Sequence, residues 1–369
     1  SSELALPHPL PQMASPTTAS KPIRVWTDGC FDMMHFGHAN ALRQAKALGA
    51  VLVVGVHSDA EIRLNKGPPV MNEAERYAAV RACQWADEVV EDAPYTTSLE
   101  VMDKYNCDFC VHGDDIVIGA DGQDTYHKVK AAGRFKTIAR TQGVSTTQLV
   151  NRMLALSATK DLQAAASSDS TPSAEKKLSP YTGISGFLPT TRKIVQFLDG
   201  RGLPKAEDKI VYIDGGFDLF HVGHSAILEK AKSLGTYLIV GVWDDATVKA
   251  RTGGPVMNLQ ERLLSVLSCR FVDEVVVGAP YILSDELIRS NQVSIVTTGT
   301  VQDKSTAPEI PEDRFAVAKM LGIFQQLESP LTLTTSDILD RIKAQRKLYE
   351  ERNAKKEARE IEEIKLRGY

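Results

Sequence analysis

Two stretches of this chain are near copies of each other, and this repetition constrains the fold more than any other feature. The first reads DGCFDMMHFGH from Asp28, and the second reads DGGFDLFHVGH from Asp214. With an offset of 186 residues the similarity continues without a gap, so that Val70-Met-Asn recurs at Val256. Beyond Gly113 the register shifts by three residues, which indicates an insertion in one loop. The pattern predicts a duplicated domain rather than a short solenoid repeat.

Each copy alternates strands with helices. The runs Val51 to Val56 and Tyr237 to Val242 are almost continuously apolar, which is typical of strands buried on both faces of a parallel sheet. Helical patterns separate such runs from one another. The sequence therefore predicts an α/β protein with two Rossmann-like domains and parallel sheets, whose ligands bind beyond the carboxyl ends of the strands.

Composition sets the expected boundaries. Residues 1–21 are rich in Pro, Ser and Thr and predict a disordered lead-in, and residues 157–183 lack apolar periodicity and predict a flexible linker. The two domains are then residues 22–156 and residues 184–340. Residues 341–369 mix Lys and Arg with Glu at helical spacing, which predicts a charged, solvated helix.

Charge and cysteine content limit the classes of partner. The net charge is −4 and the isoelectric point is near 6.1, so there is no basic field for nucleic acid, and a small charged metabolite is favoured. Five cysteines in a chain of 369 residues indicate reduced thiols and a cytoplasmic, soluble protein. No apolar run is long enough to cross a bilayer, and the charged tail has no broad apolar face, so we expect no stable membrane anchor.

The repeated turn is suited to bind phosphate. A helix that begins at such a turn offers unpaired backbone N–H groups and the positive end of its dipole, while Gly37 allows close approach and His35 and His38 add donors on one face. Lys66 supplies a mobile charge in a loop rich in Gly and Pro, and the stretch RTQGVSTT from Arg140 places more donors at another helix start. Taken singly, these features also fit core histidines, a surface lysine and a capped helix.

Together the two motifs, His-x-Gly-His and Arg-Thr-x-Gly-x-Ser-Thr-Thr, resemble the cytidylyltransferase family. The first motif marks a wider superfamily of nucleotidyltransferases with this Rossmann-like fold, and the second is specific to the cytidylyl branch. The resemblance covers residues 22–156, as the catalytic domain, and 184–353. It implies that a substrate phosphate oxygen attacks the α-phosphorus of CTP and releases pyrophosphate, with Mg²⁺ accompanying CTP and no covalent enzyme intermediate.

The resemblance also assigns the site in the first copy. Four side chains neutralise phosphate charge and stabilise the transition state, namely His35, His38, Lys66 and Arg140. The further CTP contacts are Gly29, Cys30, Phe31, Asp32, Gly37, Asp87, His112, Gly113, Asp115, Thr141, Gly143, Ser145, Thr146 and Thr147. For the three aspartates a role as cap or turn residue stays open, and no side-chain metal ligands are assigned.

The acceptor is expected to be phosphoethanolamine, bound by Asp28, Tyr95 and Tyr126. A quaternary ammonium is best held by a complete aromatic cage, whereas a primary ammonium has N–H donors for nearby acids. The resemblance implies that the cage here is incomplete, because Tyr95 and Val117 stand where the choline enzymes of the family have Trp and Tyr. The product would then serve phosphatidylethanolamine synthesis. Two alternatives remain open: the same transfer to phosphocholine or glycerol 3-phosphate, and a non-catalytic nucleotide-binding regulator.

The second copy has lost part of the pattern. Its histidines remain, but Lys66, His112 and Arg140 align with neutral residues, which are Thr252, Thr298 and Ser329. We therefore expect the second domain to be catalytically weak or silent. Its remaining candidate nucleotide contacts are Gly216, Phe217, His221, His224, Thr334 and Thr335. A homodimer and an intramolecular pseudo-dimer of the two domains are both open, as is a loose association with the endoplasmic reticulum.

Overall fold

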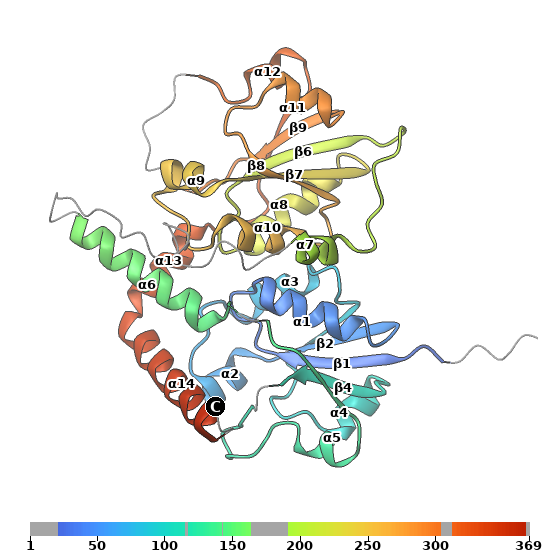
Figure 1. Ribbon diagram of the computed structural model, residues 1–369, viewed down its shortest axis with the longest axis vertical. Coiled ribbons are helices and arrows are strands. Elements are labelled where there is room, and N and C mark those ends of the chain that lie inside the picture. The colour runs from blue at the N-terminus through green and yellow to red at the C-terminus, as the bar shows by residue number, and fades with distance from the viewer. Residues whose placement is uncertain (1–20, 115–116, 142, 164–190, 304–311, 367–369) are drawn as a thin grey trace, which may run out of the picture.

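The computed structural model describes residues 21–114, 117–141, 143–163, 191–303 and 312–366. Two α/β domains are stacked along the long axis of the molecule (Figure 1). The expected lead-in and most of the expected linker lie outside the described residues. The small helix α7, Thr191–Leu198, leads into the second domain, and its buried Phe197 packs edge-on against Trp85 with ring centroids 5.0 Å apart.

The first domain is built on a five-stranded sheet in the order β3-β2-β1-β4-β5, with every pair parallel. Its strands are β1 (Arg24–Gly29), β2 (Val51–Val56), β3 (Glu88–Glu91), β4 (Phe109–Gly113) and β5 (Phe135–Ile138). Its helices are α1 (Phe36–Lys46), α2 (Asp59–Lys66), α3 (Glu73–Arg81), α4 (Leu99–Lys104), α5 (His127–Ala131) and α6 (Thr146–Gln163).

The second domain repeats this topology, in the order β10-β9-β6-β7-β8. Its strands are β6 (Ile210–Gly215), β7 (Tyr237–Trp243), β8 (Glu274–Ala279), β9 (Ile295–Gly299) and β10 (Phe324–Leu327). Its helices are α8 (Val222–Lys232), α9 (Asp245–Thr252), α10 (Leu259–Leu267), α11 (Asp285–Ser290), α12 (Ala316–Met320) and α13 (Thr335–Ala344). The prediction of two Rossmann-like α/β domains with parallel sheets is confirmed.

Strand register brings the ends of several strands together. Gly29 at the end of β1 pairs with Val56 at the end of β2, and Gly113 at the end of β4 pairs with Ile138. Because the strands are parallel, the loops that follow all four strands meet at one edge of the sheet. The repeated turn, Lys66 and the Arg140 loop all follow strands at this edge.

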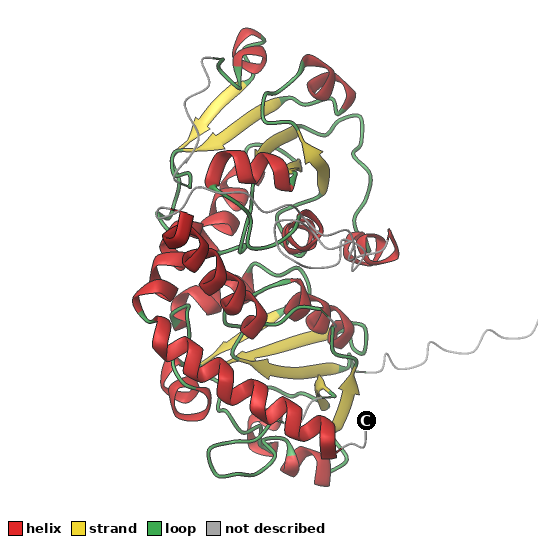
Figure 2. Cartoon of the chain, turned by 60° about the vertical axis from the view of Figure 1, so that its left-hand side comes forward, coloured by secondary structure: helices red, strands yellow, loops and turns green. Residues whose placement is uncertain are grey.

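Two of the expected boundaries need correction. Helix α6 continues to Gln163, so the first part of the predicted linker is helical. The charged C-terminal segment is divided at Gln345 between α13 and α14 (Arg346–Leu366). Most described side chains of α14 are exposed, as predicted for a charged helix, but one side of the helix packs along the first domain (Figure 2). Tyr349 is 1% exposed and Asn353 is 3% exposed in that contact.

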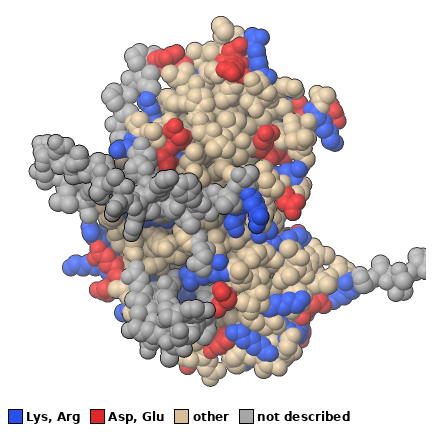
Figure 3. Space-filling model, viewed as in Figure 1, with Lys and Arg blue, Asp and Glu red and all other residues tan. Residues whose placement is uncertain are grey.

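The surface agrees with the modest net charge. On the face shown in Figure 3, Lys and Arg side chains are interspersed with Asp and Glu. Within the described segments no helix has the length and apolar content needed to cross a membrane. All five cysteines are free thiols, and four of them are buried.

The two domains meet across an approximate twofold axis. Cys83 and Cys269 form an antiparallel bridge at this contact, and the N–H of Gln84 donates to the Ser268 carbonyl at 2.9 Å. The N–H of Arg270 donates to the Ala82 carbonyl at 2.8 Å, which is the equivalent bond seen from the other domain. The interface therefore has the reciprocal form of a symmetric dimer contact, although it joins two parts of one chain.

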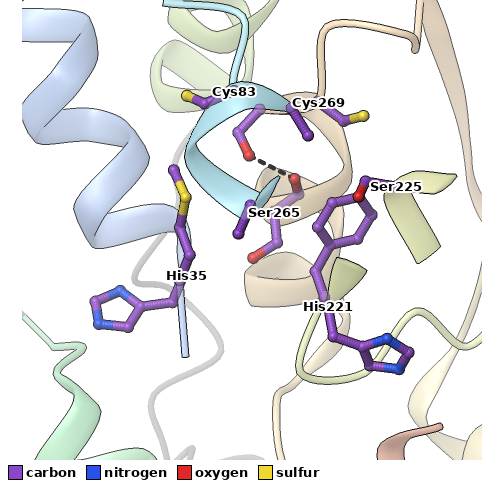
Figure 4. A pocket seen from close by; sticks show the side chains of 11 residues that line it. His35, Cys83, His221, Ser225, Ser265 and Cys269 are labelled. Atoms are coloured by element: carbon purple, nitrogen blue, oxygen red, sulfur yellow. Dashed lines mark hydrogen bonds between the residues drawn. The ribbon is translucent and has the colours of Figure 1, made fainter. Parts of the chain in front are cut away.

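A small cavity of about 20 Å³ lies on this axis and is lined by equivalent residues of both domains. In Figure 4, Cys83 and Cys269 stand at its top, while the rings of His35 and His221 point away from it in opposite directions. Each histidine thus begins at the shared interface and directs its ring into its own domain.

Two reciprocal ion pairs also cross the interface. Arg152 on α6 binds both carboxylate oxygens of Glu261 on α10, at 2.9 and 3.0 Å. Arg341 on α13 binds both oxygens of Glu75 on α3, at 2.7 Å each. Bidentate pairs of this kind fix orientation as well as distance. Helices α6 and α13, which are equivalent in the two domains, are therefore each bound to the capping-box glutamate of a helix in the other domain.

These pairs give a matched test of the contact between domains. We expect Arg152→Met to cost about 3 kcal/mol of unfolding free energy, because it leaves the fully buried Glu261 without its cation. Arg341→Met should cost about 1 kcal/mol, since that arginine is 35% exposed. Turnover should nevertheless fall more in Arg341→Met, because Glu75 supports a loop of the first-domain site. If Arg152→Met lowered turnover more than Arg341→Met did, as it is expected to lower stability more, the Arg341–Glu75 pair would have no specific effect on the first-domain site.

Candidate functional site

The paired histidines are held by the start of helix α1. His35 is the N-cap of α1, and its Nδ1 accepts a hydrogen bond from the Gly37 N–H at 3.1 Å. His38 Nδ1 accepts from the His35 N–H at 3.4 Å, and the two rings stack with centroids 4.0 Å apart. Since both Nδ1 atoms accept, the ring proton of each neutral imidazole is on Nε2. Each of the two stacked rings therefore carries its N–H donor on Nε2.

The turn tolerates little change in shape. A Cβ atom on Gly37 would lie 2.8 Å from Val144 Cγ1 and 2.9 Å from the His35 ring, so glycine is needed where the Arg140 loop passes. Phe31 and Met33 adopt positive φ angles of 49° and 47°, a conformation that ordinary residues rarely occupy. Both angles recur in the second copy, so this strained turn is a property of the domain.

Asp32 ties the turn to the segment after Lys66. Its carboxylate accepts from the N–H groups of Val70, at 3.0 Å, and Met71, at 2.9 Å. Arg352 of α14 lies 3.7 Å from the same carboxylate. Burial raises the pKa of Asp32 in spite of these donors. These contacts are those of a turn residue, one of the two roles that the sequence left open.

The Arg140 loop closes over the turn from the other side. Thr146 Oγ1 donates to the Asp32 carbonyl at 3.1 Å, and Thr141 Oγ1 accepts from Asn40 Nδ2 of α1 at 2.8 Å. Gly143 has a φ of +82°, and Ser145 Oγ accepts from the Gln148 N–H at the start of α6. The structure therefore brings the histidine turn, the segment after Lys66 and the Arg140 loop into one site.

A second group of side chains surrounds Asp28 at the end of β1. The Asp28 carboxylate accepts from Tyr126 OH at 2.6 Å, Trp26 Nε1 at 2.8 Å and Thr97 Oγ1. The ring of His112 on β4 lies 4.8 Å from that of Tyr126. The residues predicted to bind the acceptor thus surround a buried carboxylate that is held by a hydrogen-bonded network.

Tyr95 connects this pocket to Lys66. The Tyr95 ring lies 5.7 Å from Lys66 Nζ and 4.9 Å from the ring of His57. Lys66 is the last residue of α2, where Gly67 ends the helix with a φ of +88°. The predicted phosphate-binding lysine and the predicted acceptor tyrosine therefore lie side by side.

Two assigned CTP contacts have a different outcome. Asp87 lies just before β3, at the amino edge of the sheet, where it binds Lys46 Nζ and the Leu52 N–H at 2.6 Å each. We correct its assignment to a structural role, because the nucleotide end of a parallel sheet is the opposite one. Asp115 lies outside the described residues.

Arg76 was missed by sequence reasoning although it reaches the turn. It is 1% exposed, donates to the Cys30 carbonyl at 2.8 Å and pairs with Asp59 at 2.9 Å. Arg262 makes the same contacts in the second copy. The sequence signal that could have identified Arg76 is the dipeptide Glu75-Arg76, which recurs as Glu261-Arg262.

Helix α14 contributes contacts that no motif predicts. Tyr349 OH donates to the Pro69 carbonyl at 3.2 Å, and Arg352 donates to the Pro68 carbonyl at 3.0 Å. Asn353 Nδ2 donates to the backbone at the start of α6 at 3.3 Å. The helix crosses the first domain in Figure 2 and fixes the segment after Lys66 from outside.

The second domain keeps a cavity of about 190 Å³ at the equivalent place. His224 lines this cavity and stacks on His221 with ring centroids 3.8 Å apart, and burial lowers the pKa of His224 to about 4. Thr252 Oγ1 donates to a carbonyl within its own helix, so it does not replace Lys66. The loss of the lysine that alignment predicts is therefore not made good by Thr252 itself.

The same cavity has features that the alignment did not reveal. Three cationic side chains line it, namely Arg251, Arg314 and Lys343. The start of α13 is already bound by carboxylates: the Thr335 N–H donates to Asp303 at 2.8 Å, and the Thr334 N–H donates to Asp337 at 2.8 Å. The helix start that would meet a phosphate in this domain is thus held by the protein's own acids.

A family model described as cytidylyltransferase-like matches residues 26–152 and 212–338, so the chain belongs to this family. An ethanolamine-phosphate cytidylyltransferase of Dictyostelium discoideum is 56% identical over 356 residues, covering 94% of this chain and 98% of the relative. The protein of that name from Mus musculus is 45% identical over 370 residues, covering 92% of this chain and 90% of the relative. Choline-phosphate cytidylyltransferase A of Rattus norvegicus is 44% identical over 140 residues, covering 37% of this chain and 38% of the relative.

Proposed function

We propose that the first domain transfers CMP from CTP to phosphoethanolamine, giving CDP-ethanolamine and pyrophosphate for phosphatidylethanolamine synthesis. The observation that carries this proposal is the meeting of the histidine turn, Lys66 and the Arg140 loop beside the Asp28 pocket. The relatives named for this activity align over almost the whole chain, both domains included.

The reaction depends on alignment and charge neutralisation. A phosphate oxygen of the acceptor attacks the α-phosphorus of CTP, the bond from this phosphorus to the bridging oxygen breaks, and pyrophosphate leaves with the bonding electrons. In this proposal the Nε2–H groups of His35 and His38 donate to the phosphate oxygens as charge shifts, and their Nδ1 bonds at the start of α1 support this role. Lys66 and Arg140 supply positive charge, and no side chain needs to form a covalent bond to phosphorus.

Mg²⁺ enters this proposal with the triphosphate. Among the described residues, no three His, Cys, Asp or Glu side chains converge as a metal site. Asp32 is occupied by two backbone donors, so the groups facing the nucleotide are chiefly cations and N–H donors. Such a set suits an ion held mainly by phosphate oxygens, where it would neutralise the charge of the leaving pyrophosphate.

The second domain serves in this proposal as a structural partner with little or no turnover. Its cleft lacks counterparts of Lys66 and Arg140, and the start of α13 is capped internally. The reciprocal interface supports an intramolecular pseudo-dimer, and the free thiols fit a cytoplasmic location.

An assay of pyrophosphate release tests the function. The purified chain should release pyrophosphate with CTP, Mg²⁺ and phosphoethanolamine, and much less when ATP replaces CTP. Phosphocholine and glycerol 3-phosphate in place of phosphoethanolamine complete the panel. Equal or faster release with either of them would overturn the acceptor assignment, and binding of CTP without release under any condition would overturn the enzyme assignment.

A further inference from the structure

Equivalent groups of side chains lie at the ends of β1 and β6 and have opposite character; they are called here the first pocket, around Asp28, and the second pocket, around Asp214. The Thr97 N–H donates to the Thr125 carbonyl at 3.1 Å, and the Leu283 N–H donates to the Arg314 carbonyl at 3.0 Å. These matching bonds show that Arg314 stands where the first domain has Thr125. A long cationic side chain therefore enters one pocket from a position that is occupied by a short hydroxyl in the other.

Arg314 fills its pocket as a bound cation would. Its guanidinium carbon lies 4.9 Å from the ring centroid of Trp243, 4.5 Å from that of Tyr281 and 4.4 Å from that of Phe315. It also forms a salt bridge with Asp214. Aromatic faces and a carboxylate are the groups that hold an organic cation. The counterparts in the first domain are His57, Tyr95, Tyr126 and Asp28.

The difference between Trp243 and His57 changes what the pocket can accept. Trp243 Nε1 is a donor and binds Asp214 at 3.3 Å. His57 Nδ1 lies 3.0 Å from the Ala93 carbonyl, and since a carbonyl only accepts, this Nδ1 carries the proton. The imidazole is 4% exposed, and burial lowers its pKa, so it is neutral with an acceptor lone pair on Nε2. The first pocket thus has an acceptor where the second has a donor.

The carboxylate in the first pocket still has capacity for a cation. Asp28 accepts from three protein donors, and a carboxylate offers about four acceptor positions. Lys66 and His57 both lie against the Tyr95 ring. A short molecule with a phosphate at one end and an ammonium at the other can contact the lysine and this pocket together.

We propose that His57 selects a primary ammonium: its Nε2 accepts an N–H of the substrate, in the space that the Arg314 guanidinium fills in the second domain. This inference rests on the proposed function of the first domain. An ammonium has N–H donors for both His57 and Asp28. Each added methyl group removes one donor, and a trimethylammonium leaves the Nε2 lone pair desolvated without a partner, which is the kind of mismatch that strongly discriminates between substrates.

Two variants of His57 separate this role from simple packing. In His57→Asn the amide N–H can keep the bond to the Ala93 carbonyl, but no atom remains at the Nε2 position. His57→Gln can return an oxygen acceptor near that position. We measure kcat/KM with CTP for phosphoethanolamine, its N-methyl and N,N-dimethyl derivatives, and phosphocholine, using the full chain.

For His57→Asn we expect kcat/KM for phosphoethanolamine to fall about 10- to 100-fold, the usual effect of losing a hydrogen bond to a charged group. The value for phosphocholine and the KM for CTP should not change, so the preference across the methylated series narrows. His57→Gln should restore part of the preference for phosphoethanolamine. Because the preference is a ratio within one preparation, a lower folded fraction does not affect it.

The outcomes distinguish the two proposals. If the wild-type chain is active and His57→Asn lowers kcat/KM equally for all four acceptors, the proposed role of His57 is overturned but the proposed function is not. A wild-type chain that releases no pyrophosphate with phosphoethanolamine would overturn the proposed function.

Discussion

Replacing His35 with asparagine is expected to lower kcat by about 10²- to 10³-fold, the effect of removing one donor from a transition state that develops charge. Asparagine is a good N-cap and can accept from the Gly37 N–H as the Nδ1 of His35 does, so α1 should keep its start. What the variant lacks is the Nε2–H group. The loss should therefore appear in turnover, measured as pyrophosphate release at saturating substrates, with little change in the thermal unfolding midpoint.

The matched control is His221→Asn in the second domain. The same change at the same position of the fold should leave kcat within a fewfold of wild type, because that cleft lacks counterparts of Lys66 and Arg140. Circular dichroism of both variants would show that the domains remain folded. A loss of turnover in His221→Asn, with normal activity in His35→Asn, would reverse the assignment of the two domains.

Gly37→Ala is expected to have the second large effect, on both stability and turnover. The added Cβ would lie 2.8 Å from Val144 and 2.9 Å from the His35 ring, well inside normal contact. Overpacking of this kind costs about 1 to 3 kcal/mol, which denaturant unfolding would detect. A displacement of the histidine by about 1 Å should also reduce turnover about 10²-fold.

A second change distinguishes this collision from a loss of backbone freedom. Val144→Ala in the Gly37→Ala background removes one of the two colliding atoms and should recover part of the stability. Val144→Ala alone should cost stability, since Val144 is buried. If the double variant is the sum of the two single losses, the side-chain collision is not the cause.

The sequence predicted most of what depends on repetition and pattern. Duplication, the parallel sheets and the loops at the strand ends followed from apolar runs and from the two motifs. The structure adds the reason for pairing these motifs, because Thr146 binds the Asp32 carbonyl and Val144 lies against Gly37. The two motifs therefore contact each other in one site, although more than a hundred residues separate them in the sequence.

The errors and omissions arose where the place of a residue in the folded sheet could not be read from the linear pattern. Asp87 belongs to a repeated Asp-Glu-Val-Val run, but it precedes its strand and so lies at the edge away from the site. Helix α14 is so rich in charge that its few contact residues, such as Tyr349, gave no periodic signal. Arg314 follows the insertion, and nothing in the linear sequence shows that it turns back to Asp214.

The fused arrangement of the two domains has a consequence for how they diverge in evolution. In a dimer of identical chains, any substitution that fills one pocket fills both. Here the copies are encoded separately, so Arg314 and Asp303 can occupy one cleft without touching the other. Covalent linkage lets one copy change while the reciprocal pairs Arg152–Glu261 and Arg341–Glu75 keep it attached to the copy that carries Lys66 and Arg140.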